Sequence, residues 1–110
     1  MGALPAWRRL IIISIVTYSP DLALLATVLD RLGWALRHAN RSGWLTEAQL
    51  ILVDNGPGAA WRQLLQQTLE IAALPARVEL LSGHGNIGYG AGHNLALNNH
   101  DSDYHLILNP

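Results

Sequence analysis

Asp54 is the side chain whose position most clearly indicates chemistry, because it directly follows the strand expected at residues 49–53. A carboxylate at the rim of a sheet can accept hydrogen bonds from the imide of a base or from a ribose hydroxyl, which suits a nucleotide. Residues 54–58 (DNGPG) are equally typical of a turn in which Asp54 or Asn55 bonds its own backbone. Both interpretations stay open, since one side chain can hold a turn and also contact a ligand.

A glycine-rich stretch at residues 83–94 is the second candidate for ligand binding. Five of the ten residues 83–92 are glycine, so backbone amides could approach an anionic group, such as a diphosphate, without obstruction by Cβ atoms. His84 and His93 flank this loop and could contact a phosphate, although histidines in such loops are more often exposed or cap a helix.

The same stretch contains a G-x-G-x-x-G pattern at Gly83, Gly85 and Gly88, with Asp103 as a candidate acidic partner of a dinucleotide fold. Two features disfavour that interpretation. The fingerprint should open a helix at once, whereas residues 89–92 (YGAG) prolong the loop, and Asp103 precedes a strand instead of following one. A dinucleotide-binding oxidoreductase is therefore the weaker alternative.

Asp101 and Asp103 form a D-x-D pattern, and two carboxylates at this spacing could grip Mg²⁺ or Mn²⁺. Their position argues against a metal site, since they lie at the amino end of the last expected strand, across the sheet from the ligand crevice. We interpret them as a solvated turn and expect this chain alone to bind no metal. The five histidines show no metal-ligand spacing on one helix face, and no nucleophile elbow supports a hydrolase.

Strands and helices are expected to alternate along the chain. Strands are expected at residues 10–16, 49–53, 77–81 and 104–108, and helices from Ser19 as the capping residue to 38–43, over 59–71 and over 93–99. This alternation predicts an α/β fold, a Rossmann-like, mostly parallel sheet with helices on both faces. Because ligands bind beyond the carboxyl ends of parallel strands, segments 17–18, 54–55, 82–92 and 109–110 should converge.

The composition fits one globular domain, residues 1–110. Hydrophobic residues make up 50% of the chain and charged residues 14%, unlike disordered segments. The formal net charge is -1 and there is no Lys, so no basic stripe is expected and nucleic acid is disfavoured as a partner. There is no Cys, and the most apolar run, 10–16, is too short to span a bilayer. The tryptophans are expected to pack within the fold: Trp7, Trp34, Trp44 and Trp61.

With these segments in place, the chain resembles the family 2 glycosyltransferases of GT-A type, and within them the bacterial rhamnosyltransferase-like group. Residues 11–18 (IIISIVTY) resemble the family's first strand, 51–55 (ILVDN) its second strand with the base-binding Asp, and 86–94 (NIGYGAGHN) its diphosphate-side loop. Residues 106–110 (LILNP) resemble the strand that leads into the family's acidic metal-binding motif. The order and spacing of the four segments are more specific than any one of them.

The resemblance implies a nucleotide-binding role for a small set of residues: Thr17 and Tyr18 near the base, Asp54 with Asn55 on the pyrimidine or ribose, Asn86 and Gly88 beside the nucleotide, and Asn94 fixing the loop to the next helix. It implies no catalytic residue here, because the family's metal-binding Asp follows the Asn-Pro pair and its acceptor site comes later. The Ser19-Pro20 pair departs from the Asn often found after Thr-Tyr, which affects the substrate assignment.

On this resemblance the chain is the nucleotide-sugar-binding half of a cytoplasmic or inner-membrane-associated enzyme, truncated after the fourth strand and inactive alone. The full enzyme would transfer a sugar, for instance rhamnose, from a nucleoside diphosphate donor to a glycan or lipid-linked acceptor, with Mg²⁺ or Mn²⁺ neutralising the diphosphate. The alternatives are a non-catalytic nucleotide-binding or interaction module and the dinucleotide-binding oxidoreductase. An incomplete sheet should expose an edge or an apolar face, which predicts self-association.

Overall fold

The computed structural model describes residues 9–98 and 100–110. In this part of the chain strands and helices alternate. The strands are β1 (Leu10–Thr17), β2 (Glu47–Asp54), β3 (Arg77–Leu81) and β4 (Tyr104–Ile107), and the helices are α1 (Leu22–Arg41), α2 (Ala60–Ala72) and α3 (Gly88–Leu97). The expected order of strands and helices is thus confirmed.

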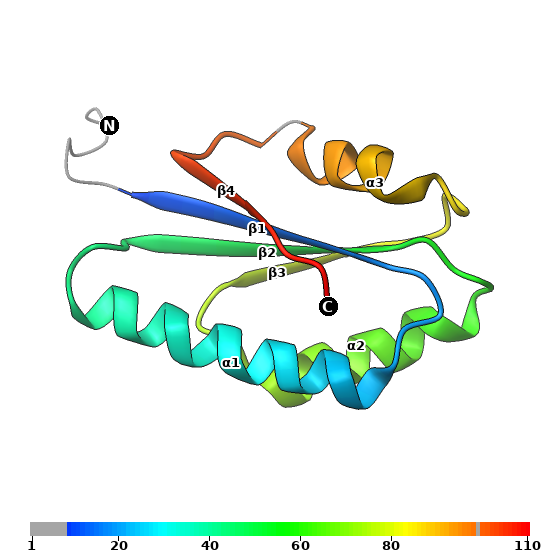
Figure 1. Ribbon diagram of the computed structural model, residues 1–110, viewed down its shortest axis with the longest axis horizontal. Coiled ribbons are helices and arrows are strands. Elements are labelled where there is room, and N and C mark those ends of the chain that lie inside the picture. Colours follow the sequence, from blue (N-terminus) through cyan, green and yellow to red (C-terminus); the bar gives the residue numbers. More distant parts are fainter. Residues whose placement is uncertain (1–8, 99) are drawn as a thin grey trace.

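The strands form one parallel sheet in the order β3-β2-β1-β4. Helices α1 and α2 cover one face of the sheet, and α3 lies on the opposite face (Figure 1). The expected α/β architecture, a Rossmann-like parallel sheet with helices on both faces, is confirmed. Ile13 lies opposite Leu50 on β2 and Leu106 on β4, so the carboxyl ends of these strands reach the same edge.

β1 is buried on both faces because it runs through the middle of the sheet. Ile13 and Ile15 belong to the larger core, which the sheet shares with α1 and α2. Ile12 and Val16 belong to a smaller core that includes Ala96 of α3. Ser14 is a polar residue in the middle of this apolar strand and is 0% exposed, so its hydroxyl needs a partner inside the protein.

The start of α1 differs from the expectation. Asp21, and not Ser19, is the N-cap, and its Oδ1 accepts a hydrogen bond of 3.0 Å from Leu24 N. Ser19 has a positive φ of 47°, and its N–H donates to Gly56 O at 2.8 Å. Ser19 is therefore used to join the β1–α1 loop to the turn after β2, and Asp21 is the first residue free to cap the helix.

The start of α3 is also earlier than predicted, at Gly88 instead of His93. Glycine lowers helix propensity, so the sequence indicates a loop here. Tertiary packing overrides that preference, because Gly92 lies against Val16 so closely that a Cβ atom would come within 2.8 Å of Val16 Cγ2. The end of α3 lies at Leu97, and Asn99, included in the predicted helix, is outside the described residues.

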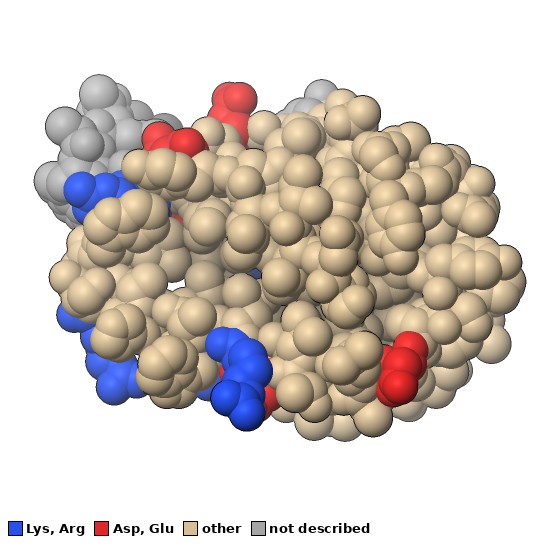
Figure 2. Space-filling view, in the orientation of Figure 1, with Lys and Arg blue, Asp and Glu red and all other residues tan. Residues whose placement is uncertain are grey.

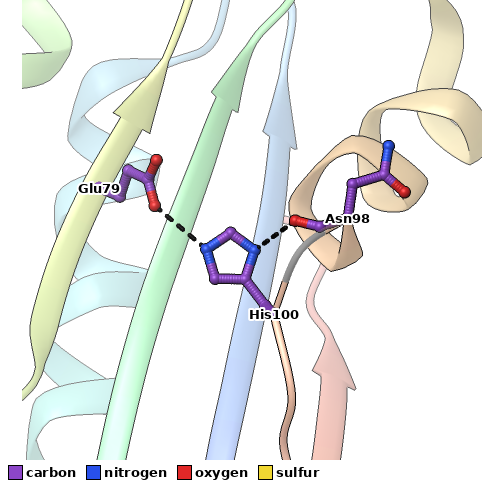
Figure 3. A network of polar contacts seen from close by, with 3 residues as sticks. All are labelled: Glu79, Asn98 and His100. Atoms are coloured by element: carbon purple, nitrogen blue, oxygen red, sulfur yellow. Dashed lines mark hydrogen bonds and ion pairs between the residues drawn. The ribbon is translucent and has the colours of Figure 1, made fainter.

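The segment between α3 and β4 is tied back to β3. His100 Nδ1 donates to Asn98 O at 2.7 Å, and its Nε2 lies 3.4 Å from Glu79 Oε2. In Figure 3 the ring lies between Glu79 on β3 and the end of α3. This contact ties the segment to β3 on the face that α3 covers.

The prediction that the tryptophans pack within the fold holds for Trp61 and is wrong for Trp34 and Trp44. Trp61 packs partly buried against the larger core, but Trp34 is 65% exposed and Trp44 is exposed, while Trp7 lies outside the described residues.

Figure 2 shows few, separated charged side chains on one face of the described molecule. Among the helices of the described ranges, none is long and apolar enough to cross a membrane.

Candidate functional site

An open cavity of about 610 Å³ lies at the carboxyl ends of β2 and β3. Three of the predicted segments reach its wall, through Tyr18, Asp54 with Asn55, and the loop that includes Ser82 and Asn86. Residues 56–59 and Arg62 at the start of α2 complete the wall. The fourth predicted segment, 109–110, follows β4 on the far side of β1 and does not line this cavity.

Asp54 is the last residue of β2 and is only 4% exposed. Its Oδ1 accepts a hydrogen bond of 2.9 Å from Gly56 N, which is the turn that the sequence indicated. The same residue lines the cavity. Its carboxylate therefore stabilises the turn and also lies where it could accept a hydrogen bond from a ligand. The turn is confirmed, and the contact with a nucleotide stays a prediction.

Asn55 holds the glycine-rich loop in place. Its Nδ2 donates to Gly88 O at 3.1 Å, and its Oδ1 accepts from His84 Nε2 at 2.9 Å. Because an amide oxygen can only accept, the Nε2 of His84 carries the hydrogen. Asn55 borders the cavity, but its amide is used to fasten the loop, which makes it a positioning residue.

The two residues predicted near the base have different environments. Tyr18 is 51% exposed and lies on the cavity wall, where its ring offers a stacking surface. Thr17 is buried, its Oγ1 donates to Val53 O at 3.5 Å, and it does not line the cavity. Its predicted contact with a base is therefore not provided by this cavity.

The glycine-rich loop supplies one of its three predicted contacts to the cavity. Asn86 lines the wall, and its Oδ1 accepts from Gly88 N at 3.0 Å. Gly88 lies outside the wall and opens α3. Asn94 is exposed within α3, and among the described residues it is the side chain of Asn55, and not that of Asn94, that bonds the start of this helix.

Arg62 is a cavity residue that the sequence reasoning did not select. It lies in the first turn of α2, and its Nη1 donates to Ser82 Oγ, which also lines the cavity. An arginine shortly after a turn that closes a parallel strand could have been noted as facing the ligand crevice.

A second missed feature is a buried polar cluster beneath α3. Ser14 Oγ lies 2.7 Å from His93 Nδ1 and 2.7 Å from His105 Nε2. His93 is 6% exposed, so the prediction that it flanks the loop at the surface or contacts a phosphate is wrong. The signal in the sequence was Ser14 itself, a hydroxyl inside an otherwise apolar buried strand.

The hydroxyl of Ser14 has one hydrogen, so it donates to one ring and accepts from the other. His93 Nε2 is buried without a hydrogen-bond partner among the described residues. We assign the hydrogen of His93 to Nδ1, because the orphaned Nε2 is then a bare acceptor and not an unpaired donor. Ser14 then donates to His105 Nε2. Burial, and secondly the neighbouring His93, lower the pKa of His105, which favours this neutral arrangement.

The D-x-D pattern lies away from the cavity, as predicted. Asp103 Oδ2 accepts a hydrogen bond of 2.8 Å from Leu10 N, at the amino edge of the sheet. Within the described ranges, no group of three or more His, Cys, Asp or Glu side chains could hold a metal ion. Among the described residues, Asp54 is the one carboxylate on the cavity wall, so the wall offers a metal ion a single charged ligand.

The G-x-G-x-x-G pattern has the helix start that a dinucleotide fold requires, but it lacks the acidic partner. The expectation that residues 89–92 prolong the loop is wrong, since α3 opens directly at Gly88. Asp103 still precedes its strand and bonds the amino edge of β1, opposite to the glycine-rich loop. The acidic partner of a dinucleotide site is therefore not supplied by Asp103.

Comparison with known proteins does not assign the chain. No protein-family model matches it, and no curated protein and no solved structure gives a significant match.

Proposed function

We propose that this chain is the nucleotide-sugar-binding part of a family 2, GT-A type glycosyltransferase, whose full enzyme moves a sugar from a nucleoside diphosphate donor to a glycan or lipid-linked acceptor. The observation that carries the proposal is Asp54, a buried carboxylate that closes β2 and lines an open cavity. In this proposal Asp54 accepts hydrogen bonds from the base or ribose.

The size and chemistry of the cavity support this proposal. A volume of about 610 Å³ is within the range of small-molecule sites, roughly 300–1,000 Å³. Tyr18 offers an aromatic face to a base, and the amide of Asn55 holds the glycine-rich loop beside it. A planar base with N–H donors and a polar tail is the kind of ligand that such a wall fits.

The placement of three of the four resembling segments supports it further. Residues 11–17 belong to β1 with Tyr18 after it, 51–54 end β2 with Asn55 after it, and 106–107 end β4 with 108–110 after it. The fourth segment, 86–94, is a loop in the resemblance, whereas residues 88–94 lie in α3. The donor sugar, for which rhamnose is the candidate, and the acceptor rest on the resemblance alone.

The test is calorimetric titration of the chain with thymidine, uridine and guanosine diphosphates and with NADH, for the native protein and for Asp54→Asn. Asn keeps the acceptor for Gly56 N and removes the charge, so the turn is preserved. A pyrimidine nucleotide should bind, and Asp54→Asn should weaken it roughly tenfold or more, as expected for a lost hydrogen bond to a charged group.

Asp30→Asn is the matched control, because Asp30 is an exposed aspartate on α1 and does not line the cavity. It should leave the affinity unchanged. Binding that is equal in the native protein and in Asp54→Asn would contradict the proposed role of Asp54. Binding of NADH alone would favour the dinucleotide alternative, for which the start of α3 at Gly88 is the supporting observation.

A further inference from the structure

Arg62 gives the cavity wall a positive charge. Its side chain extends from the first turns of α2 to Ser82, which follows β3, so it lies along the wall. Asp54 stands on the same wall at the end of β2. The cavity therefore presents a carboxylate and a guanidinium, each from a different element.

No carboxylate of the described residues forms an ion pair with Arg62. Within the described ranges its side-chain partner is the neutral hydroxyl of Ser82, and no ion pair joins it to Asp54. A guanidinium has five N–H donors, and Nη1 makes the bond to Ser82. The remaining donors are free to bind an anion while Ser82 restricts the orientation of the side chain.

We propose that Arg62 binds the phosphate of the nucleotide in this cavity and thereby sets both its orientation and the preference for phosphorylated ligands. This inference rests on the proposed function. The base or ribose lies toward Asp54, whose carboxylate accepts hydrogen bonds, and the anionic phosphate lies toward Arg62. A ligand in the reverse orientation would bring its phosphate to the carboxylate, and the two like charges would repel.

The geometry favours arginine for this role over a simple point charge. The planar guanidinium can donate two parallel hydrogen bonds to phosphate oxygens, which a lysine ammonium cannot do. The same wall contains the start of α2, where Ala59 provides no side-chain cap and the first turn has no acidic residue. The positive end of that helix adds to the field of Arg62.

The experiment is an affinity series with thymidine, thymidine monophosphate and thymidine diphosphate, titrated without added metal at low ionic strength. In the native protein, affinity should rise at least about tenfold from thymidine to the monophosphate, the gain of a charge-assisted hydrogen bond. Arg62→Gln should abolish most of this rise while leaving thymidine binding unchanged. Arg62→Lys should keep part of the rise, because it retains the charge and loses the two-point contact.

Arg77→Gln is the matched control, since it makes the same charge change at an exposed residue at the opposite end of β3. It should leave the series unchanged, and circular dichroism should show that all variants are folded. A rise that persists in Arg62→Gln, or that is absent in the native protein, overturns the inference.

The two proposals fail in different ways. In one outcome thymidine does not bind, but the monophosphate binds and still depends on Arg62. This result would count against the contact with Asp54 and support the phosphate contact. Thymidine binding that Asp54→Asn weakens, without any effect of Arg62→Gln on the nucleotides, would support the proposed function and overturn the role of Arg62. Absence of binding by every nucleotide overturns both.

Discussion

Replacing Gly92 by alanine should destabilise the protein even though alanine is the better helix former. The added Cβ would lie 2.8 Å from Val16 Cγ2 and 3.0 Å from Cγ1, in the middle of the contact between α3 and β1. Relieving this overlap requires α3 or Val16 to move, and overpacking of this kind costs about 1–3 kcal/mol. The gain in helix propensity, about 1 kcal/mol, offsets only part of that cost.

Gly90→Ala is an internal control in the same helix. A Cβ at Gly90 meets nothing within 4 Å, and neither glycine has a positive φ. The propensity gains of the two substitutions are similar, so the variants should differ in free energy of unfolding by about 1–3 kcal/mol, the cost of overpacking. Urea denaturation followed by circular dichroism measures this difference.

A third variant identifies the contact responsible. In a Val16→Ala background the two Cγ atoms are gone, so Gly92→Ala should become neutral or stabilising, with a coupling energy of about 0.5–3 kcal/mol. Equal stability of Gly92→Ala and Gly90→Ala in the native background would refute the close packing of α3 on β1.

Two further predictions concern the half-buried His105 and the sheet edge. The pKa of His105 is lowered from its ordinary value of 6.5, so the unfolded chain binds more protons, and stability should fall as pH drops below about 6.5. Urea midpoints at a series of pH values measure this, and His105→Gln should reduce the slope. β4 is an edge strand with Leu106 and Ile107 exposed, so self-association is expected, and Ile107→Lys should weaken it. Analytical ultracentrifugation measures the oligomeric state, and a native protein that stays monomeric at high concentration would contradict this prediction.

The sheet was predictable because its signals are local. Residues 77–81 are the observed β3, and the other strands extend or end within a few residues of their predicted bounds. The convergence of Asp54 and the glycine-rich loop followed from one rule, that parallel strands end at one edge. These features depend on apolar patterning and turn residues, which lie next to each other in the sequence.

The parts that were missed depend on distant partners. Ser14 meets His93 and His105 from elements far along the chain, and no local pattern reveals that the sheet order brings β4 beside β1. The glycines at residues 88–92 predict a loop by their low helix propensity, whereas in the structure this segment is helical and Gly92 packs against Val16 on β1. The local sequence predicts Ser19 as the cap, but Ser19 N donates to Gly56 O of another loop, a contact that no local pattern reveals.

The place of β1 in the sheet has a consequence for the order of folding. β1 pairs first in sequence with β2, but its other neighbour, β4, is separated from it by nearly the whole described chain, as the bond from Leu10 N to Asp103 shows. Pairing over such a distance closes a long loop and is slow. During synthesis the β4 side of β1 therefore stays an open, apolar edge until β4 emerges, and in that interval another chain can pair with it.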